Sequence, residues 1–237
     1  MYRHFIKRFF DFTVSLVGLL ILSPVILIIV IAIKIDSRGP VLFKQKRVGI
    51  HKKHFSILKF RTMKIDTPKD TPTHLLENPE QYITRVGKFL RKTSLDELPQ
   101  IWNILMFQMS IVGPRPALWN QYDLIEERDK YGANDVPPGL TGWAQINGRD
   151  ELPINVKAMF DGEYTRKMSF VFDVKCFLLT IKKVVKRTGI VEGRHQEQVQ
   201  NIHIEKNEKT IQSEVVFEIA ESEAIVQPES MFETINR

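Results

Sequence analysis

Two adjacent carboxylates, Asp96 and Glu97, lie in the stretch of the sequence that is richest in groups able to do chemistry. Ser94 precedes Glu97 by three residues, which is the spacing of a capping box, and Pro99 is tolerated only in the first turn of a helix. The pattern therefore predicts a helix that begins here. Because a helix N-terminus attracts anions, we expect Asp96 to be ionised and a phosphate to bind favourably beside it.

The residues after the acid pair predict how this helix packs. Its apolar side chains recur at the spacing of one helical face: Leu98, Ile101, Trp102, Leu105, Met106 and Met109. Just beyond them, Pro114 and Pro116 fix φ on both sides of Arg115, which suits a bidentate clamp on a phosphate. The simpler interpretation of Asp96 and Glu97 is that they only cap a helix and favour its dipole.

The segment resembles the core signature of the bacterial sugar transferases, the monotopic phosphoglycosyl transferases, which move a phosphosugar from a UDP-sugar to a polyprenyl phosphate. The resemblance covers about residues 1–190 and is carried by five blocks in chain order. The blocks are residues 59–63, 94–100, 112–116, 138–149 and 161–173. Because five blocks match in the same order, the resemblance does not rest on a chance match to one short motif.

The resemblance implies covalent catalysis in which Asp96 attacks the β-phosphate, UMP leaves, and the phosphosugar waits for undecaprenyl phosphate. Glu97 is implied as an essential neighbour that holds metal or manages protons. Mg²⁺ is the expected cofactor, with Asp96 and Glu97 as ligands, because it prefers a few carboxylates together with substrate phosphates. The implied substrate-binding residues are Lys59, Arg61, Arg115, Arg149 and Asp161.

The formal net charge of +6 is unevenly distributed over the 237 residues. Residues 195–237 hold nine glutamates against three basic residues, a net charge of −6, so residues 1–194 carry +12. A basic body binds polyanions, and nucleic acid, anionic lipid and nucleotide diphosphates all qualify. We expect no nucleic-acid partner, since no such motif is present. The single Cys176 excludes an intramolecular disulfide and suits a reducing compartment.

The N-terminal segment predicts membrane association. Residues 1–11 alternate aromatic and basic groups, and residues 12–33 then contain no charged side chain. These 22 residues would just cross a bilayer as a helix. Ser23 and Pro24 lie in the middle of the run, where proline breaks the backbone ladder and the serine hydroxyl can satisfy a freed carbonyl. A re-entrant helix-break-helix is therefore predicted, as the resemblance also implies.

Two alternatives remain for this apolar run. A cleavable signal peptide would explain the basic residues before it, although the run is long for one and lacks a small-x-small cleavage site. An ordinary spanning helix would explain its length. The flanks favour re-entry, because both are basic and a spanning helix places only one flank in the cytoplasm.

The remaining patterns predict a helix-rich α/β fold with three parts: a re-entrant membrane segment (1–36), a catalytic domain (37–194) and an acidic extension (195–237). Residues 54–60 read as a strand, 66–80 as a loop, 117–131 as a short amphipathic helix, and 174–185 as a helix with a cationic end. Asn147-Gly148 is a strong hairpin turn that would present Arg149. The acidic extension is expected to be dispensable for chemistry.

Together these features predict an enzyme of the bacterial inner membrane, with its active site facing the cytoplasm and a role in polysaccharide or glycoconjugate assembly. Its partners would be a UDP-sugar, undecaprenyl phosphate, membrane lipids and, as an open possibility, further copies of itself. Two other classes stay open: a Mg²⁺-dependent hydrolase of lipid or nucleotide diphosphates, and a membrane-anchored adaptor. The sequence does not identify the sugar.

Overall fold

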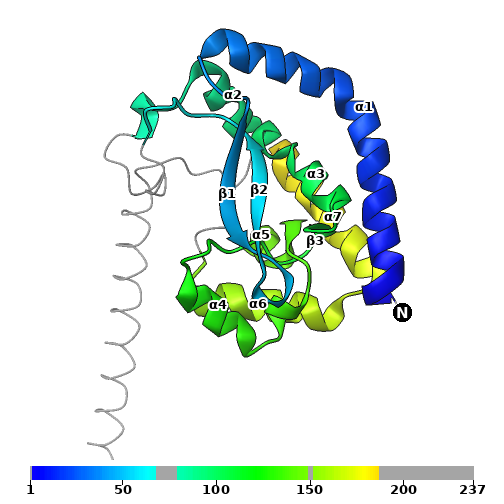
Figure 1. Cartoon of the computed structure of the whole chain (residues 1–237). Coiled ribbons are helices and arrows are strands. Elements are labelled where there is room, and N and C mark those ends of the chain that lie inside the picture. Colours follow the sequence, from blue (N-terminus) through cyan, green and yellow to red (C-terminus); the bar gives the residue numbers. More distant parts are fainter. Residues whose placement is uncertain (1, 68–78, 149–151, 187–237) are drawn as a thin grey trace, which may run out of the picture. The chain divides into compact units, whose positions relative to one another are not determined.

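The computed structural model describes residues 2–67, 79–148 and 152–186, and these form a helix-rich α/β fold (Figure 1). A π-helical turn (Tyr2–Ile6) leads into the first helix. The elements are α1 (Lys7–Asp36), β1 (Leu42–Val48), β2 (His54–Phe60), α2 (Arg85–Thr93), α3 (Gln100–Leu105), β3 (Ser110–Val112), α4 (Tyr122–Asp129), β4 (Gly139–Thr141), α5 (Trp143–Asn147), α6 (Ile154–Lys167) and α7 (Phe170–Lys186). By compactness the chain divides after Ile190, and the predicted extension at 195–237 lies outside the described residues.

Helix α1 is one helix of 30 residues with Pro24 inside it, whereas the sequence predicted a helix-break-helix. Proline lacks the N–H that would bond the carbonyl of Leu20, and the Ser23 hydroxyl donates to that carbonyl instead at 2.8 Å. The helix is otherwise continuous, so the structure has a bent helix where a helix-break-helix was predicted (Figure 1), and the re-entrant membrane topology stays a prediction. Among the described residues, α1 alone is long and apolar enough to cross a membrane.

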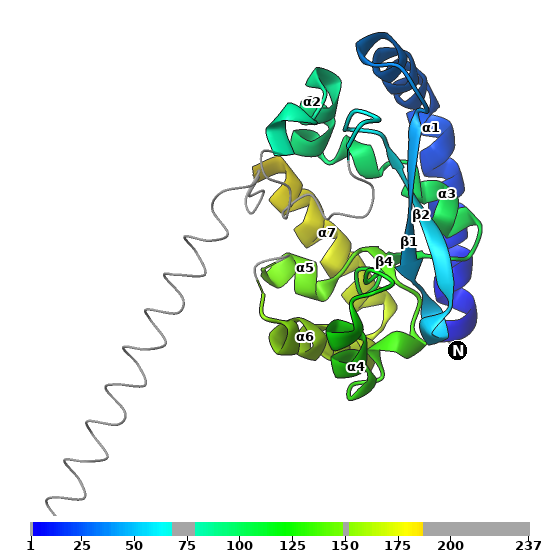
Figure 2. The ribbon, with the colours of Figure 1, turned by 60° about the vertical axis from the view of Figure 1, so that its left-hand side comes forward.

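The strands form two small sheets. Strands β1 and β2 make an antiparallel hairpin in which Phe43 pairs with Lys59, and β3 and β4 run parallel. The predicted strand at 54–60 is confirmed at both ends. In both ribbon views the hairpin extends between α2 at one end and the group formed by α4, α5 and α6 at the other (Figures 1 and 2). The last residues of β2 therefore emerge beside α2 and the segment that follows it.

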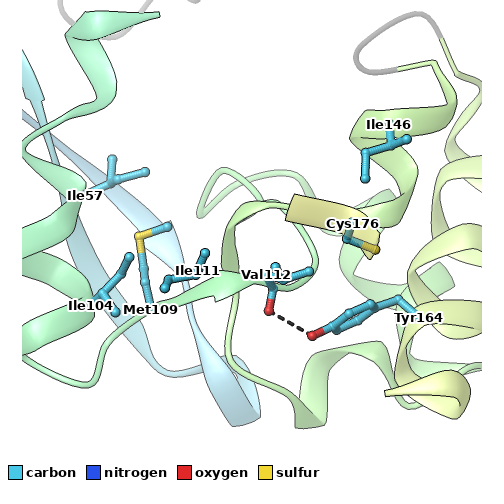
Figure 3. Close-up of a cluster of buried hydrophobic side chains, with 8 residues drawn as sticks. All are labelled: Ile57, Ile104, Met109, Ile111, Val112, Ile146, Tyr164 and Cys176. Atoms are coloured by element: carbon cyan, nitrogen blue, oxygen red, sulfur yellow. Dashed lines mark hydrogen bonds between the residues drawn. The ribbon is translucent and has the colours of Figure 1, made fainter. Parts of the chain in front are cut away.

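One core cluster joins the hairpin, the parallel pair and α7 (Figure 3). Its buried members are Ile57, Ile104, Met109, Ile111, Val112, Ile146, Tyr164 and Cys176. The Tyr164 hydroxyl donates to the Val112 carbonyl at 2.8 Å, so the polar end of this buried ring is satisfied. Cys176 is a buried free thiol, as expected for a small apolar residue. A second cluster packs Ile29 and Ile33 of α1 against β2 and α2.

A buried polar network fastens the start of α1 to the loop-bearing strand β3. Lys7 Nζ lies 2.7 Å from Asp173 Oδ2, and Asp173 Oδ1 lies 2.8 Å from the oxygen of the Tyr164 hydroxyl. Asp11 lies one turn further along α1. Its carboxylate accepts hydrogen bonds from the Ser110 hydroxyl and from the backbone N–H of Ile111. Buried charges persist only when paired and hydrogen-bonded, and these are. Helix α1 is thus tied directly to the strand that precedes Arg115.

The helix predicted to begin at Ser94 begins later. Ser94 is the left-handed C-cap of α2 (φ 56°), so its side chain makes no cap bond, and Leu95–Glu97 form a 3₁₀ turn, η5. Helix α3 starts only at Gln100 and ends at Leu105. The predicted apolar face is also wrong, because Ile101 and Ile104 are buried while Trp102 and Met106 are exposed. Met109 is fully buried, but beyond the helix end.

The Asn147-Gly148 pair closes a helix instead of forming the predicted hairpin. Residues Trp143–Asn147 are helical, and Gly148 follows them as the C-cap with φ 163° and ψ −2°. The Trp143 ring packs on Phe172 of α7, with ring centroids 5.1 Å apart, so tertiary packing outweighs the local turn preference. Helix α7 begins at Phe170, four residues before the predicted start.

Candidate active site

The acid pair lies on η5, between α2 and α3, and faces the end of β2. Lys59, the penultimate residue of β2, places its Nζ 2.7 Å from Glu97 Oε1 and 3.9 Å from Asp96 Oδ2. The side chains of all three are only partly exposed, at 18% for Lys59, 14% for Asp96 and 19% for Glu97. The structure thus brings together three of the predicted site residues.

Arg115 completes the cluster from the loop after β3. Its Nη2 donates to Glu97 Oε1 at 3.1 Å, so one carboxylate oxygen is shared by two cations. Gly113 has no room for a side chain, since a Cβ there would lie 2.4 Å from the Pro137 carbonyl oxygen. Tight backbone packing at Gly113 and the two flanking prolines hold Arg115 toward the acid pair, as predicted.

The two carboxylates differ electrostatically. Burial raises the pKa of Asp96 above its ordinary value, Lys59 lowers it, and the neighbouring Glu97 charge raises it again. Burial also acts to raise the pKa of Glu97, but Arg115 and Lys59 outweigh it and hold that pKa well below its usual range. Glu97 is therefore ionised and forms ion pairs with two cations. Asp96 makes only a longer contact with Lys59, so its negative charge is less fully neutralised.

Asn103 fixes the distance between the strand and the turn that carry the site. Its Oδ1 accepts from the Leu58 backbone N–H at 2.9 Å, and its Nδ2 donates to the Ser56 carbonyl at 2.9 Å. This fully buried amide of α3 is hydrogen-bonded to the strand residue that precedes Lys59. The sequence places Asn103 directly after the acid block, yet nothing in its spacing reveals this role.

Asp161 does not contact the cluster as predicted. It is buried, and its Oδ2 accepts from Arg128 at 2.6 Å and 2.8 Å. Arg128 in turn donates to the backbone carbonyl of Arg115 at 2.9 Å. Asp161 is therefore linked to the Arg115 loop through Arg128, and its predicted role in substrate binding stays a prediction.

Arg61 is also placed elsewhere. Its guanidinium is buried and donates to the backbone carbonyls of Ser37 and Arg38 and to the Ser37 hydroxyl, which ties the end of α1 to the end of β2. A guanidinium with five donors serves carbonyl oxygens as well as phosphates, and the sequence alone does not distinguish the two. Arg149 lies outside the described residues.

A cavity of about 350 Å³ opens beside the acid pair. Glu97 and Arg115 contribute to its lining, together with Gln145 of α5 and Thr180 and Lys183 of α7. The sequence marked Lys183 only as part of a cationic helix end, with a membrane contact or dipole compensation as its suggested roles. Its place in the lining could not be read from spacing, because α7 and the acid pair are far apart in the chain.

The described residues contain no group of three or more His, Cys, Asp or Glu side chains that could hold a metal ion. Asp96 and the second carboxylate oxygen of Glu97 are the groups near which an ion could bind, because Oε1 of Glu97 already accepts from Lys59 and Arg115. One oxygen from Asp96 and one from Glu97 would suit an ion that takes most of its ligands from phosphates and water, as Mg²⁺ usually does.

The Arg128–Asp161 pair is expected to contribute strongly to stability. Asp161→Asn keeps the shape but leaves a buried guanidinium without its anion, and we expect a loss of about 3–5 kcal/mol in the free energy of unfolding. Thermal unfolding of the purified protein measures it. Glu127→Gln is the control, since its partner Lys130 is exposed, and should leave the melting temperature unchanged. Equal melting of Asp161→Asn and the parent would contradict this account.

Known proteins that are similar to this chain identify its family. The family model described as bacterial sugar transferase matches residues 2–187, which include every candidate site residue. The chain belongs to the bacterial sugar transferase family. The match ends close to the last described residue of α7 and does not include the acidic extension predicted at 195–237.

Several curated relatives are similar over this same region. The undecaprenyl-phosphate glucose phosphotransferase of Komagataeibacter xylinus is 41% identical over 76% of this chain and 36% of its own length. The UDP-glucose:undecaprenyl-phosphate glucose-1-phosphate transferase of Escherichia coli is 43% identical over 75% and 40%. The uncharacterized sugar transferase EpsL of Bacillus subtilis is 40% identical over 80% and 92%. The chain thus spans under half of two of these relatives and nearly all of the third.

Proposed function

We propose that this chain is a phosphoglycosyl transferase that moves a sugar 1-phosphate from a UDP-sugar to undecaprenyl phosphate through a covalent intermediate on Asp96. The observation that carries the proposal is the difference between the two carboxylates: Glu97 pairs with Lys59 at 2.7 Å and with Arg115 at 3.1 Å, while Asp96 lies 3.9 Å from Lys59. Glu97 and Arg115 also line the adjacent cavity. The name of the Escherichia coli relative specifies the same type of donor and acceptor for that protein.

Two displacements would make up the reaction. In the first, an Asp96 carboxylate oxygen bonds to the β-phosphorus of the donor, the bridging P–O bond breaks, and UMP leaves with its electron pair. In the second, an oxygen of undecaprenyl phosphate bonds to the same phosphorus and the carboxylate leaves. The product is a polyprenyl diphosphate sugar. Splitting the reaction in this way avoids a direct attack of one phosphate anion on a diphosphate.

Lys59 and Arg115 would lower the electrostatic barrier to the first step. Both already lie within hydrogen-bonding distance of Glu97, so their charges are held in place before the substrate arrives. Mg²⁺, held by Asp96 and Glu97 with the donor phosphates, would supply further charge neutralisation at the diphosphate. The burial of the site strengthens all of these interactions relative to water.

Helix α1 supports a location at the inner membrane, with the active site at the cytoplasmic surface. The acceptor phosphate lies at the headgroup plane while the nucleotide sugar is soluble, so the site must stand at that plane. Exposed apolar side chains follow most of α1, including Leu20, Ile21 and Ile28. Helix α1 bends along its length (Figure 1) and contains Pro24, and such a bend would let both basic flanks stay on the cytoplasmic side, as a re-entrant helix requires.

Removing the bend should change the topology. We expect the double substitution Ser23→Ala with Pro24→Leu to straighten α1, expose one flank outside the cell, and lower activity about 100-fold by displacing the site from the acceptor phosphate. Cysteines placed at positions 4 and 50 and labelled with an impermeant thiol reagent in intact cells give the readout. Cys176 is buried and adds little background.

Leu27→Ala is the matched control, because Leu27 is exposed on the same helix and leaves the backbone ladder intact. It should leave both labelled positions shielded and the activity unchanged. Labelling of position 4 from outside in the parent protein would show that the helix spans, and the re-entrant proposal would then be wrong.

Product analysis tests the function itself. The full chain in detergent, given Mg²⁺, a panel of UDP-sugars and undecaprenyl phosphate, should release UMP and form a lipid diphosphate sugar with at least one donor. Release of free sugar phosphate without any lipid acceptor would instead identify a hydrolase. Absence of UMP release with every donor, in protein that remains folded, would favour a membrane-anchored adaptor.

A further inference from the structure

The cavity beside the acid pair contains a buried hydrogen-bond acceptor that no described residue satisfies. Gln145 of α5 lines the cavity, and its Oε1 is buried without a donor among residues 2–67, 79–148 and 152–186. The amide is oriented by its other end, since Nε2 makes a long 3.5 Å bond to the Leu140 carbonyl. A buried amide oxygen without a donor is costly, and a ligand N–H would remove that cost.

A second acceptor lies on the same lining. The Thr180 hydroxyl donates to the Cys176 carbonyl at 2.8 Å, so in its 2.6 Å contact with Thr141 it is Thr141 that donates and Thr180 that accepts. Both hydroxyl hydrogens are then used within the protein. Thr141 Oγ1 keeps its lone pairs. Gln145 Oε1 and Thr141 Oγ1 therefore both offer acceptors to a ligand that donates a hydrogen bond.

Five aliphatic side chains contribute the apolar part of the lining: Leu95, Leu98, Ile101, Leu140 and Ile146. Apolar walls with a few fixed polar groups are typical of a site for a flat, mostly apolar ring with polar edges. A hexose, which carries hydroxyls all around, would leave several of them facing these aliphatic side chains. Arg115 and Lys183 line the same cavity and supply positive charge for phosphates attached to such a ring.

We propose that Gln145 reads the uracil ring of the donor, with Oε1 accepting from the uracil N3–H and Nε2 donating to a neighbouring ring carbonyl. This inference rests on the proposed function, because it assigns the nucleotide half of the UDP-sugar to the cavity. Uracil offers one N–H between two carbonyl oxygens, which complements an amide that presents an oxygen and an N–H side by side. Gln145 is thus a specificity-determining residue, and it takes no part in the displacement at phosphorus.

Binding of nucleotides without turnover tests this assignment. UMP and N3-methyl-UMP, which lacks the N–H donor, are titrated calorimetrically into the full chain in detergent and into its Gln145→Met variant. For the parent, N3-methylation should weaken binding by about 10- to 100-fold. For Gln145→Met, UMP itself should bind more weakly by a similar factor, and N3-methylation should cost less than about threefold, because the shared hydrogen bond is already absent.

Gln81→Met is the control, since Gln81 is exposed and does not line the cavity, and it should retain the full penalty for N3-methylation. An equal penalty in the parent and in Gln145→Met would overturn the inference, as would equal binding of both nucleotides by the parent. UMP release from a UDP-sugar by the parent is measured in parallel. Normal turnover with either overturning result would reject the role of Gln145 alone, and the absence of turnover with all donors would reject the proposed function.

Discussion

Asp96→Asn is expected to abolish transferase turnover, with a loss of more than about 1,000-fold in kcat, while the fold is retained. The substitution keeps the size of the side chain but removes the anionic oxygen that attacks the β-phosphorus. Asp96 is only 14% exposed and its closest cation lies 3.9 Å away, so asparagine fits without leaving a strongly bound partner unpaired. Steady-state UMP release with a cognate UDP-sugar measures the effect.

Asp123→Asn is the matched control for this variant. Asp123 is an exposed acid in the first turn of α4, and its carboxylate bonds only to the next backbone N–H. It should show turnover within about twofold of the parent, as is usual for a surface substitution. If Asp96→Asn also turned over at that level, the nucleophile would have to be another group, or the reaction would need no covalent step.

Glu97→Gln is expected to lower kcat/KM by roughly 100-fold. Glu97 Oε1 holds Lys59 at 2.7 Å and Arg115 at 3.1 Å, and a neutral amide would release both cations from their fixed positions. The Asp96 carboxylate would then become their only nearby anion, which would make it a poorer nucleophile. Activity assays over a range of donor concentrations separate the effect on kcat from the effect on KM.

Two further variants make this prediction specific. Glu97→Asp keeps the charge with a shorter reach and should fall between the parent and Glu97→Gln. Glu127→Gln removes a carboxylate that pairs only with an exposed lysine and should have no effect on activity. A Glu97→Gln protein as active as the parent would mean that the two cations are positioned by other contacts.

The sequence was most informative where local patterns decide the structure. Strand β2 has the predicted bounds and buries Ile57 and Phe60, and Lys59 is its penultimate residue, paired with Phe43 of β1. The position of Arg115 near the acid pair was also predictable, since proline on both sides restricts the loop. The helix-rich α/β class and the family resemblance are borne out by the structure and by the match over residues 2–187.

Contacts between distant segments account for the failures. Ser94 and Glu97 have the spacing of a capping box, but Ser94 adopts a left-handed conformation to close α2, and that conformation removes the cap. Arg61 and Asp161 have the right chemistry for a phosphate site, yet each finds a protein partner far away in the chain. A local sequence pattern does not predict which distant residue will form an ion pair or hydrogen bond with a buried charged side chain.

The residues that the sequence missed have the same explanation. Asn103 bonds to β2 across 45 residues, and Gln145 of α5 and Lys183 of α7 line the same cavity as Glu97 only once the chain is folded. Their types are common and their spacing is unremarkable for a helix. Only the folded arrangement shows that they face the site.

The covalent intermediate is the central claim, and peptide mass spectrometry tests it most directly. The purified chain is incubated with its UDP-sugar and Mg²⁺, without lipid acceptor, then digested and analysed together with the Asp96→Asn variant. The account predicts one added phosphosugar mass on the peptide that contains Asp96, with one UMP released per chain, and neither in the variant. An adduct on a different peptide, or full turnover with undecaprenyl phosphate and no adduct under any condition, would contradict it.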